Sequence, residues 1–166
     1  MKLRDLIELP VDAKTRPPRP KLGPRKSTDY QNSVRHWAEL CDAKMSPDAA
    51  SFMKTDTSLA LRGALVAKDE DRFAEYHHPM YRARWAEPRD LSDREVVRQL
   101  LSDAGLDGDA ALARAESDEI GDRLEHDTKA AIERGVFGVP TIFVGDEMFW
   151  GNDRFELVKL HLNKTA

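Results

Sequence analysis

Residues 135–154 read Gly-Val-Phe-Gly-Val-Pro-Thr-Ile-Phe-Val-Gly-Asp-Glu-Met-Phe-Trp-Gly-Asn-Asp-Arg. Two short runs, Thr141 to Val144 and Glu147 to Trp150, flank the pair Gly145-Asp146, and this pattern predicts a β-hairpin. Asn152-Asp153 is a suitable N-cap pair, because Glu156 follows three residues after Asp153 and an apolar run lies beyond it. The stretch therefore predicts a strand, a turn, a second strand and a helix.

This stretch resembles the C-terminal segment of the 2-hydroxychromene-2-carboxylate isomerases, which are glutathione-dependent relatives of kappa-class glutathione transferases and DsbA-like oxidoreductases. The resemblance rests on residues 135–141, on the Gly-Asp-Glu-Met turn and on Trp-Gly-Asn-Asp-Arg, and it continues through Trp37-Ala38 and Ala60-Leu61-Arg62. It implies an α/β, thioredoxin-like fold of the DsbA and kappa type with an inserted helical subdomain.

Composition favours one helix-rich domain. The chain has 166 residues, of which 34% are charged, and its mean hydropathy is −0.61. It contains no apolar run long enough to cross a membrane and no signal-peptide pattern, so we expect a cytoplasmic protein. The single cysteine, Cys41, cannot form a Cys-x-x-Cys redox centre, and its place in a helical pattern predicts a small core residue.

The charge is unevenly spread along the chain. The net charge is −4, yet the first 37 residues are basic, and the remainder is acidic. A basic segment can bind nucleic acid or a small anion. Because this segment has many prolines and few aromatic side chains, it does not resemble a base-stacking surface, and we expect no nucleic-acid partner.

Three regions follow from the pattern of the chain. Residues 1–26 are predicted to hold a remnant of the thioredoxin-like module, with a strand over Lys2 to Leu9 and a proline-rich basic loop. Residues 27–116 form the inserted helical subdomain. Residues 117–166 form the C-terminal half of the module, with a helix, a cis-proline, the hairpin and a last helix.

The helices of the middle region are predicted from caps and apolar spacing. A first helix, capped by Ser27 or Thr28, runs to about Ala43 and has a core-facing stripe at Tyr30, Val34, Trp37 and Leu40. An irregular connection over Ser46 to Asp56 leads to a helix over Thr57 to Ala67. A further helix over Asp69 to Ala86 is expected to kink or divide at Pro79.

Cap signals predict the remaining helices. Ser92 to Glu95 is a capping box for a helix over Asp93 to Ala104, which ends at Gly105. A short helix follows over Asp107 to Glu116. Ser117 caps a longer helix, Asp118 to Arg134, which Gly135 ends and whose inward stripe is Ile120, Leu124, Thr128, Ala131 and Ile132.

His77 and His78 stand beside Pro79 and could suggest a metal site. Adjacent histidines point about 100° apart on a helix, and no Glu or Cys stands at a chelating spacing. We therefore predict no metal.

The resemblance also implies what this sequence does not contain. In the family, a strand and a Ser-Pro turn open the thioredoxin-like module, and that serine lies beside the glutathione sulfur. No serine here follows a predicted strand in such a turn, so the catalytic residue of the family is unassigned. Lys2 to Leu9 resembles the family's second strand, and we expect the first strand and its turn to be absent.

The resemblance implies that glutathione is the cofactor and that Val139-Pro140 is the family's cis-proline position. A cis bond would turn the backbone N–H and C=O of Val139 outward to pair with the cysteinyl residue of glutathione. Trp150, Gly151, Asn152 and Asp153 would hold the γ-glutamyl end near a helix N-terminus. The alternatives are an ordinary turn proline before a strand, and an Asn152-Asp153 pair that only caps the helix.

For the substrate, the resemblance implies an aromatic 2-oxo carboxylate. Lys14 best matches the family's substrate-binding lysine, and Phe52 could supply an aromatic wall; both could equally be solvated surface residues. Other candidate partners for the anion, which cannot be ranked, are Arg16, Arg19, Lys21, Arg25 and Lys26.

The implied reaction is a cis–trans isomerisation in aromatic-compound breakdown, in which the glutathione thiolate adds, the former double bond rotates and the thiol leaves. Alternatives are a kappa-type glutathione transferase, or a shortened protein that binds glutathione or a partner without turnover. Relatives in this family are commonly dimers, so a homodimer is possible.

Overall fold

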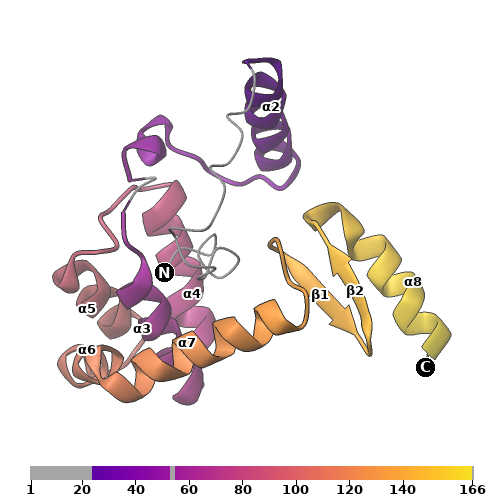
Figure 1. The fold of residues 1–166 in the computed structure, drawn as a ribbon. Helices are drawn as coiled ribbons and strands as arrows, with labels where there is room; N and C mark the ends of the chain where they lie inside the picture. The colour runs from indigo at the N-terminus through magenta and orange to yellow at the C-terminus, as the bar shows by residue number, and fades with distance from the viewer. Residues whose placement is uncertain (1–23, 53–54, 166) are drawn as a thin grey trace, which may run out of the picture.

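The computed structural model describes residues 24–52 and 55–165 (Figure 1). The strand and proline-rich loop predicted for the first residues, with Lys14 and the basic residues from Arg16 to Lys21, lie outside the described residues. The described chain forms a body of packed helices, from which one long helix leads to a hairpin and a terminal helix. The order of elements is α2 (Pro24–Leu40), η1 (Pro47–Phe52), α3 (Ser58–Asp69), α4 (Phe73–Trp85), α5 (Arg94–Asp103), α6 (Gly108–Glu116), α7 (Asp118–Glu133), β1 (Thr141–Val144), β2 (Glu147–Trp150), η2 (Asn152–Arg154) and α8 (Phe155–Thr165).

The core lies where α3 to α6 pack together with the N-terminal part of α7, and we call this assembly the helical body. Its fully buried side chains include Val66, Tyr76, Leu101 and Ile120. The hydroxyl of Tyr76 donates a hydrogen bond to the carbonyl oxygen of Ala60 at 2.9 Å, and burial raises the pKa of this hydroxyl. Gly63 leaves the necessary room, because a Cβ there would stand 2.6 Å from the hydroxyl oxygen.

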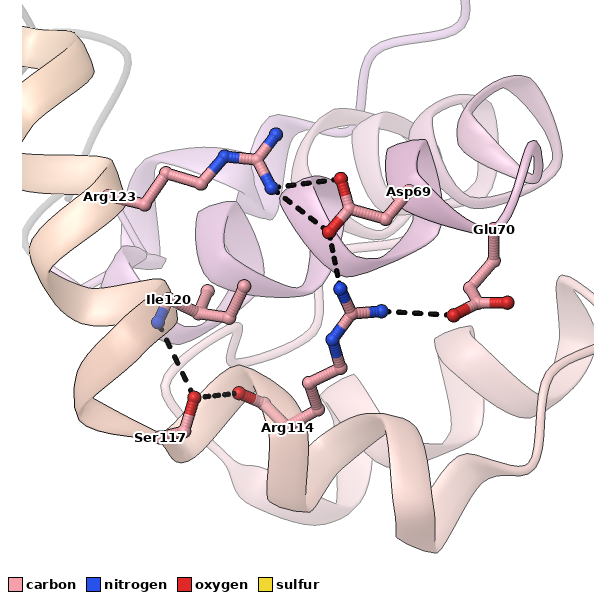
Figure 2. Close-up of polar contacts among 6 residues, drawn as sticks. All are labelled: Asp69, Glu70, Arg114, Ser117, Ile120 and Arg123. Atoms are coloured by element: carbon pink, nitrogen blue, oxygen red, sulfur yellow. Dashed lines mark hydrogen bonds and ion pairs between the residues drawn. The ribbon is translucent and has the colours of Figure 1, made fainter.

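An ion-pair network joins three helices of the helical body (Figure 2). The guanidinium of Arg114 on α6 contacts Asp69 at 2.6 Å and Glu70 at 2.9 Å, at the end of α3. Arg123 on α7 contacts Asp69 at 2.8 Å from the other side. Asp69 is therefore shared by two arginines and links α3 to both α6 and α7.

Most predicted helix ends are confirmed. The Ser117 hydroxyl caps α7 by accepting from the N–H of Ile120 at 3.4 Å. Gly105 and Gly135 follow α5 and α7 in a left-handed conformation, each with φ of 87°, and each closes a Schellman motif. The predicted capping box at Ser92 is wrong in detail: Asp93 is the N-cap and accepts from the N–H of Glu95 at 2.9 Å.

Of the two outcomes predicted at Pro79, a kink or a division of the helix, the division does not occur. Pro79 lies inside the continuous helix α4, and the chain breaks earlier, between α3 and α4. Asp71 takes a φ of 56° there, and the N–H of Arg72 reaches back to the carbonyl of Ala67 at 2.7 Å. This is the same Schellman ending as at the two glycines, but its left-handed residue is an aspartate, which tolerates that conformation better than most side chains do.

The predicted core face of the first helix is also wrong. The helix, α2, begins at Pro24 and ends at Leu40, and it lies apart from the helical body in Figure 1. Its apolar residues are exposed or half-buried: Tyr30 is 64% exposed, Trp37 38% and Leu40 75%. Cys41, predicted as a core residue, is exposed as well. Helical spacing is present, but no described element covers this face.

The hairpin forms as predicted. Strands β1 and β2 pair antiparallel, with Thr141 opposite Trp150 and Val144 opposite Glu147, and Gly145 takes a φ of 60° in the turn between them. Helix α8 packs against the hairpin, and its Val158 is 8% exposed. Within residues 24–52 and 55–165, no helix combines the length and apolar character of a membrane span.

Candidate functional site

The segment between α7 and β1 begins with a sharp helix stop and ends with a cis peptide bond. The N–H groups of Gly135 and Val136 bond back to the carbonyls of Ile132 and Ala131 at 2.8 Å and 3.1 Å. The Val139–Pro140 bond is cis, as predicted. The hydroxyl of Thr141 donates to the carbonyl of Gly138, which closes the segment onto the first residue of β1.

The indole of Trp150 lies on this segment. Gly138 is buried, and a Cβ added there would overlap Nε1 of Trp150 and stand 2.6 Å from its Cε2. The ring of Phe137 lies 5.0 Å from that of Trp150, tilted by 54°. Gly138, the residue before Val139-Pro140, therefore provides the space in which the indole sits.

The predicted glutathione-contacting residues lie together at the open end of the hairpin. The N–H of Gly151 donates to the carbonyl of Pro140 at 3.0 Å, which continues the pairing of β1 with β2. Gly151 has a φ of 117°, and Asn152 and Asp153 follow it, both exposed, in the first turn before α8. Asp153 contacts Arg154 at 3.6 Å.

Within the described part of the chain, the backbone of Val139 is not paired. Val139 is 38% exposed, and among the described residues neither its N–H nor its C=O has a hydrogen-bond partner. A free donor and acceptor on one residue can pair with an extended peptide as one rung of a ladder. The arrangement can thus bind a short peptide whose charged end reaches the turn before α8.

Two predicted substrate residues cannot be placed. Lys14 lies outside the described residues, as does the side chain of Phe52 in η1. Conversely, Phe137 and Gly138 were not among the predicted site residues, although both stand directly before Val139-Pro140. The sequence signal for their close packing was Gly138, which stands next to Val139-Pro140, together with Trp150 at the end of the strand that pairs with β1.

The two adjacent histidines of α4 lie near aromatic rings. The ring of His77 lies between those of Phe73, at 4.9 Å, and Tyr81, at 4.5 Å. Burial, and secondarily the neighbouring His78, lowers the pKa of His77. In the part of the chain that the structure describes, no three His, Cys, Asp or Glu side chains gather in a metal-binding cluster.

Comparison with known families identifies one match along nearly the whole chain. The model of the DSBA-like thioredoxin domain matches residues 5–163. The solved structure of a selenomethionine-labelled 2-hydroxychromene-2-carboxylate isomerase is similar, with a TM-score of 0.70 and 30% identity, covering 87% of this chain and 72% of that one. The predicted DsbA-like thioredoxin fold is therefore confirmed.

Curated proteins that are similar in sequence also include 2-hydroxychromene-2-carboxylate isomerases. A 2-hydroxychromene-2-carboxylate isomerase of Pseudomonas sp. (strain C18) is 34% identical over 128 residues, covering 76% of this chain and 58% of the relative. One of Sphingobium xenophagum is 34% identical over 129 residues, covering 78% and 64%. The chain thus spans less than two thirds of the length of these relatives.

Proposed function

Because the chain belongs to the DSBA-like thioredoxin family, in its 2-hydroxychromene-2-carboxylate isomerase group, we propose that it binds glutathione and acts in glutathione-dependent isomerisation. The substrate class is an aromatic 2-oxo carboxylate of the 2-hydroxychromene-2-carboxylate type. The observation that carries this proposal is the juxtaposition of the Val139 backbone, which has no hydrogen-bond partner among the described residues, with the exposed Asn152-Asp153 turn.

The residues present fit a glutathione molecule in two ways. The N–H and C=O of Val139 can pair with the cysteinyl residue, because glutathione is a peptide with the complementary groups. The γ-glutamyl end carries a carboxylate and an ammonium group. The carboxylate suits Asn152 and the backbone N–H groups of Asn152 and Asp153, which have no partner among the described residues, and the ammonium suits the Asp153 carboxylate.

The protein's own part in the reaction is to bind and orient. Bound glutathione supplies a thiol nucleophile. The sequence itself contains no Cys-x-x-Cys pair. The indole of Trp150, held against Gly138, restricts how a ligand can lie beside Val139. This positioning lowers the entropic barrier of a reaction between two bound molecules.

The proposal is tested by calorimetric titration of the full chain with reduced glutathione. Asp153→Ala is expected to weaken binding by roughly ten-fold or more, because a charge-assisted hydrogen bond is lost. The matched control is Asp146→Ala, which removes an exposed aspartate of the hairpin turn and should leave binding unchanged. Absence of glutathione binding by the unaltered chain contradicts the proposal.

An activity assay separates the reaction types. Turnover of 2-hydroxychromene-2-carboxylate that requires glutathione supports the isomerase. Conjugation of glutathione to an electrophile without isomerisation indicates a kappa-type transferase instead. Binding with neither reaction indicates a protein that retains glutathione without catalysis.

A further inference from the structure

The two faces of the hairpin have different surroundings. Residues directly opposite each other in the register share a face, so the side chains alternate between the faces along each strand. Helix α8 covers the face that carries Phe149 and Glu147: the ring of His161 lies 5.7 Å from that of Phe149, and its Nδ1 lies 3.1 Å from Glu147. The other face carries Thr141, Phe143, Met148 and Trp150, and we call it the α7-side face.

Two side chains from the end of α7 border the α7-side face. The guanidinium carbon of Arg134 lies 3.7 Å above the ring of Phe143. At the other end, Phe137 lies 5.0 Å from Trp150, and these two rings are 56% and 49% exposed. The face therefore has a cation at one end and an accessible aromatic pair at the other.

The distance between the Arg134 guanidinium at one end of the face and the Phe137–Trp150 ring pair at the other suits a small flat anion. Thr141 lies opposite Trp150, and Phe143 follows two residues later, which is roughly 7 Å along the strand. A bicyclic aromatic acid is of comparable length. Its ring can stack on Phe137 and Trp150 while its carboxylate points toward the guanidinium.

Unlike Arg94, Arg114 and Arg123, Arg134 has no carboxylate partner among the described residues. Its place at the C-cap of α7 explains a positive charge there, since the end of a helix favours cations. With the guanidinium stacked on Phe143, the N–H groups at its edge have no partner among the described residues, and they match a carboxylate in a bidentate manner.

We propose that Arg134 binds the carboxylate of the aromatic substrate and that Phe137 and Trp150 contact its ring. This inference rests on the proposed function and deepens it, because it assigns the substrate end of the site to Arg134 and Phe137, which lie outside the glutathione-contacting set, together with Trp150, which belongs to that set. It predicts that charge recognition depends on Arg134 alone and that ring recognition depends on Phe137.

The test uses two probes that differ only in charge: chromone-2-carboxylate and the neutral chromone-2-carboxamide. Their dissociation constants are measured by calorimetry with the full chain saturated with glutathione. The unaltered protein is expected to bind the carboxylate roughly ten-fold or more tightly than the carboxamide. Arg134→Met should abolish this preference, whereas Phe137→Ala should weaken both probes by similar factors.

Arg89→Met is the control, because Arg89 is exposed on the loop between α4 and α5, has no carboxylate partner among the described residues and belongs to the helical body. The inference is overturned if Arg134→Met keeps the preference for the carboxylate over the carboxamide. It is also overturned if Arg89→Met reduces that preference as much as Arg134→Met does. Should Arg134→Met fail to fold, Arg134→Lys replaces it. That variant keeps the charge but not the bidentate geometry, so an unchanged preference contradicts the inference.

Glutathione titrations of the same samples separate the two proposals. If the protein binds glutathione but neither chromone, only the assignment of the α7-side face is wrong. If it does not bind glutathione, the proposed function itself is contradicted.

Discussion

The helical body and the C-terminal part of the chain differ in how they bury apolar side chains. The helical body encloses Tyr76, Leu101 and Ile120 completely. We call residues 141–165 the hairpin unit; its buried apolar residue is Val158, while Trp150, Phe155, Leu157 and Leu160 are each about half exposed. The ion pairs of Figure 2 also belong to the helical body.

Because of this difference in burial, the residues that stabilise the fold and the residues proposed to bind ligands lie in different parts of the molecule. Two strands and one helix bury little surface and are marginally stable alone, whereas the helical body has a continuous core. The residues that we propose for glutathione and substrate lie in the hairpin unit and in the segment that joins it to α7. Substitutions in the helical body should therefore affect folding, and substitutions near the hairpin should affect binding.

The largest expected effect is that of a cavity in the helical body. Leu101→Ala is expected to lower the free energy of unfolding by about 2–5 kcal/mol, because Leu101 is fully buried and its loss leaves a void. Leu157→Ala in α8, where Leu157 is 47% exposed, should cost much less. Urea denaturation of both variants measures the difference, and equal losses would contradict the distinction between the two regions.

A smaller effect, on binding, is expected at Gly138. Gly138→Ala places a Cβ where the indole of Trp150 lies, and such overpacking costs about 1–3 kcal/mol. Because Trp150 must move, glutathione affinity should fall by roughly ten-fold or more. Calorimetric titration with glutathione measures the loss.

A double-mutant cycle isolates the cause of that effect. If the indole is what Gly138 accommodates, Gly138→Ala should have little further effect in the background of Trp150→Ala. An undiminished effect in that background would show that Gly138 acts through another contact.

The charge network gives a pH-dependent prediction for the helical body. The hydrogen bond from Arg123, followed by the charges of Arg123 and Arg114, lowers the pKa of Asp69. Asp69 therefore stays ionised in the folded chain at pH values where it is protonated in the unfolded chain. Its contribution to stability is present above pH 3.8, the ordinary value, and is lost as the pH falls through the lowered pKa.

Asp69→Asn is expected to cost about 1 kcal/mol or less at neutral pH, because the ion pairs are solvent-exposed. The difference from the unaltered chain should vanish below the lowered pKa. Urea denaturation at neutral and acidic pH measures both quantities. Asp122→Asn, an exposed aspartate of α7 without an ion-pair partner among the described residues, is the control; a difference that persists in acid would contradict this role.

Local signals predicted much of the fold. The hairpin bounds, the Ser117 cap and the glycine stops at Gly105 and Gly135 depend on residues close in sequence, so the sequence contains them directly. The chain after α3 makes the same left-handed Schellman ending, but at Asp71 instead of at a glycine. A left-handed aspartate has no comparably strong signature. Pro79 does have a strong signature, yet the helix is not divided there.

Burial and long-range contacts were harder to predict. The stripe on α2 has the spacing of a core face, yet Trp37 and Leu40 are exposed, because spacing does not specify which element covers a face. The cis bond before Pro140 followed from the resemblance. The contact of Gly138 with Trp150 and that of Arg134 with Phe143 required the relative position of α7 and the hairpin, which no local pattern encodes.

The smallest expected effect concerns the outer face of α8. Leu160 is 53% exposed, so a lysine there can keep its charged group in water while its aliphatic stem covers the same surface. Leu160→Lys should change the free energy of unfolding by less than about 0.5 kcal/mol. Urea denaturation and sedimentation velocity test this at several protein concentrations. A loss above about 1 kcal/mol, or a shift from dimer to monomer, would mean that a second copy covers α8, and the hairpin unit would then derive its stability from that copy.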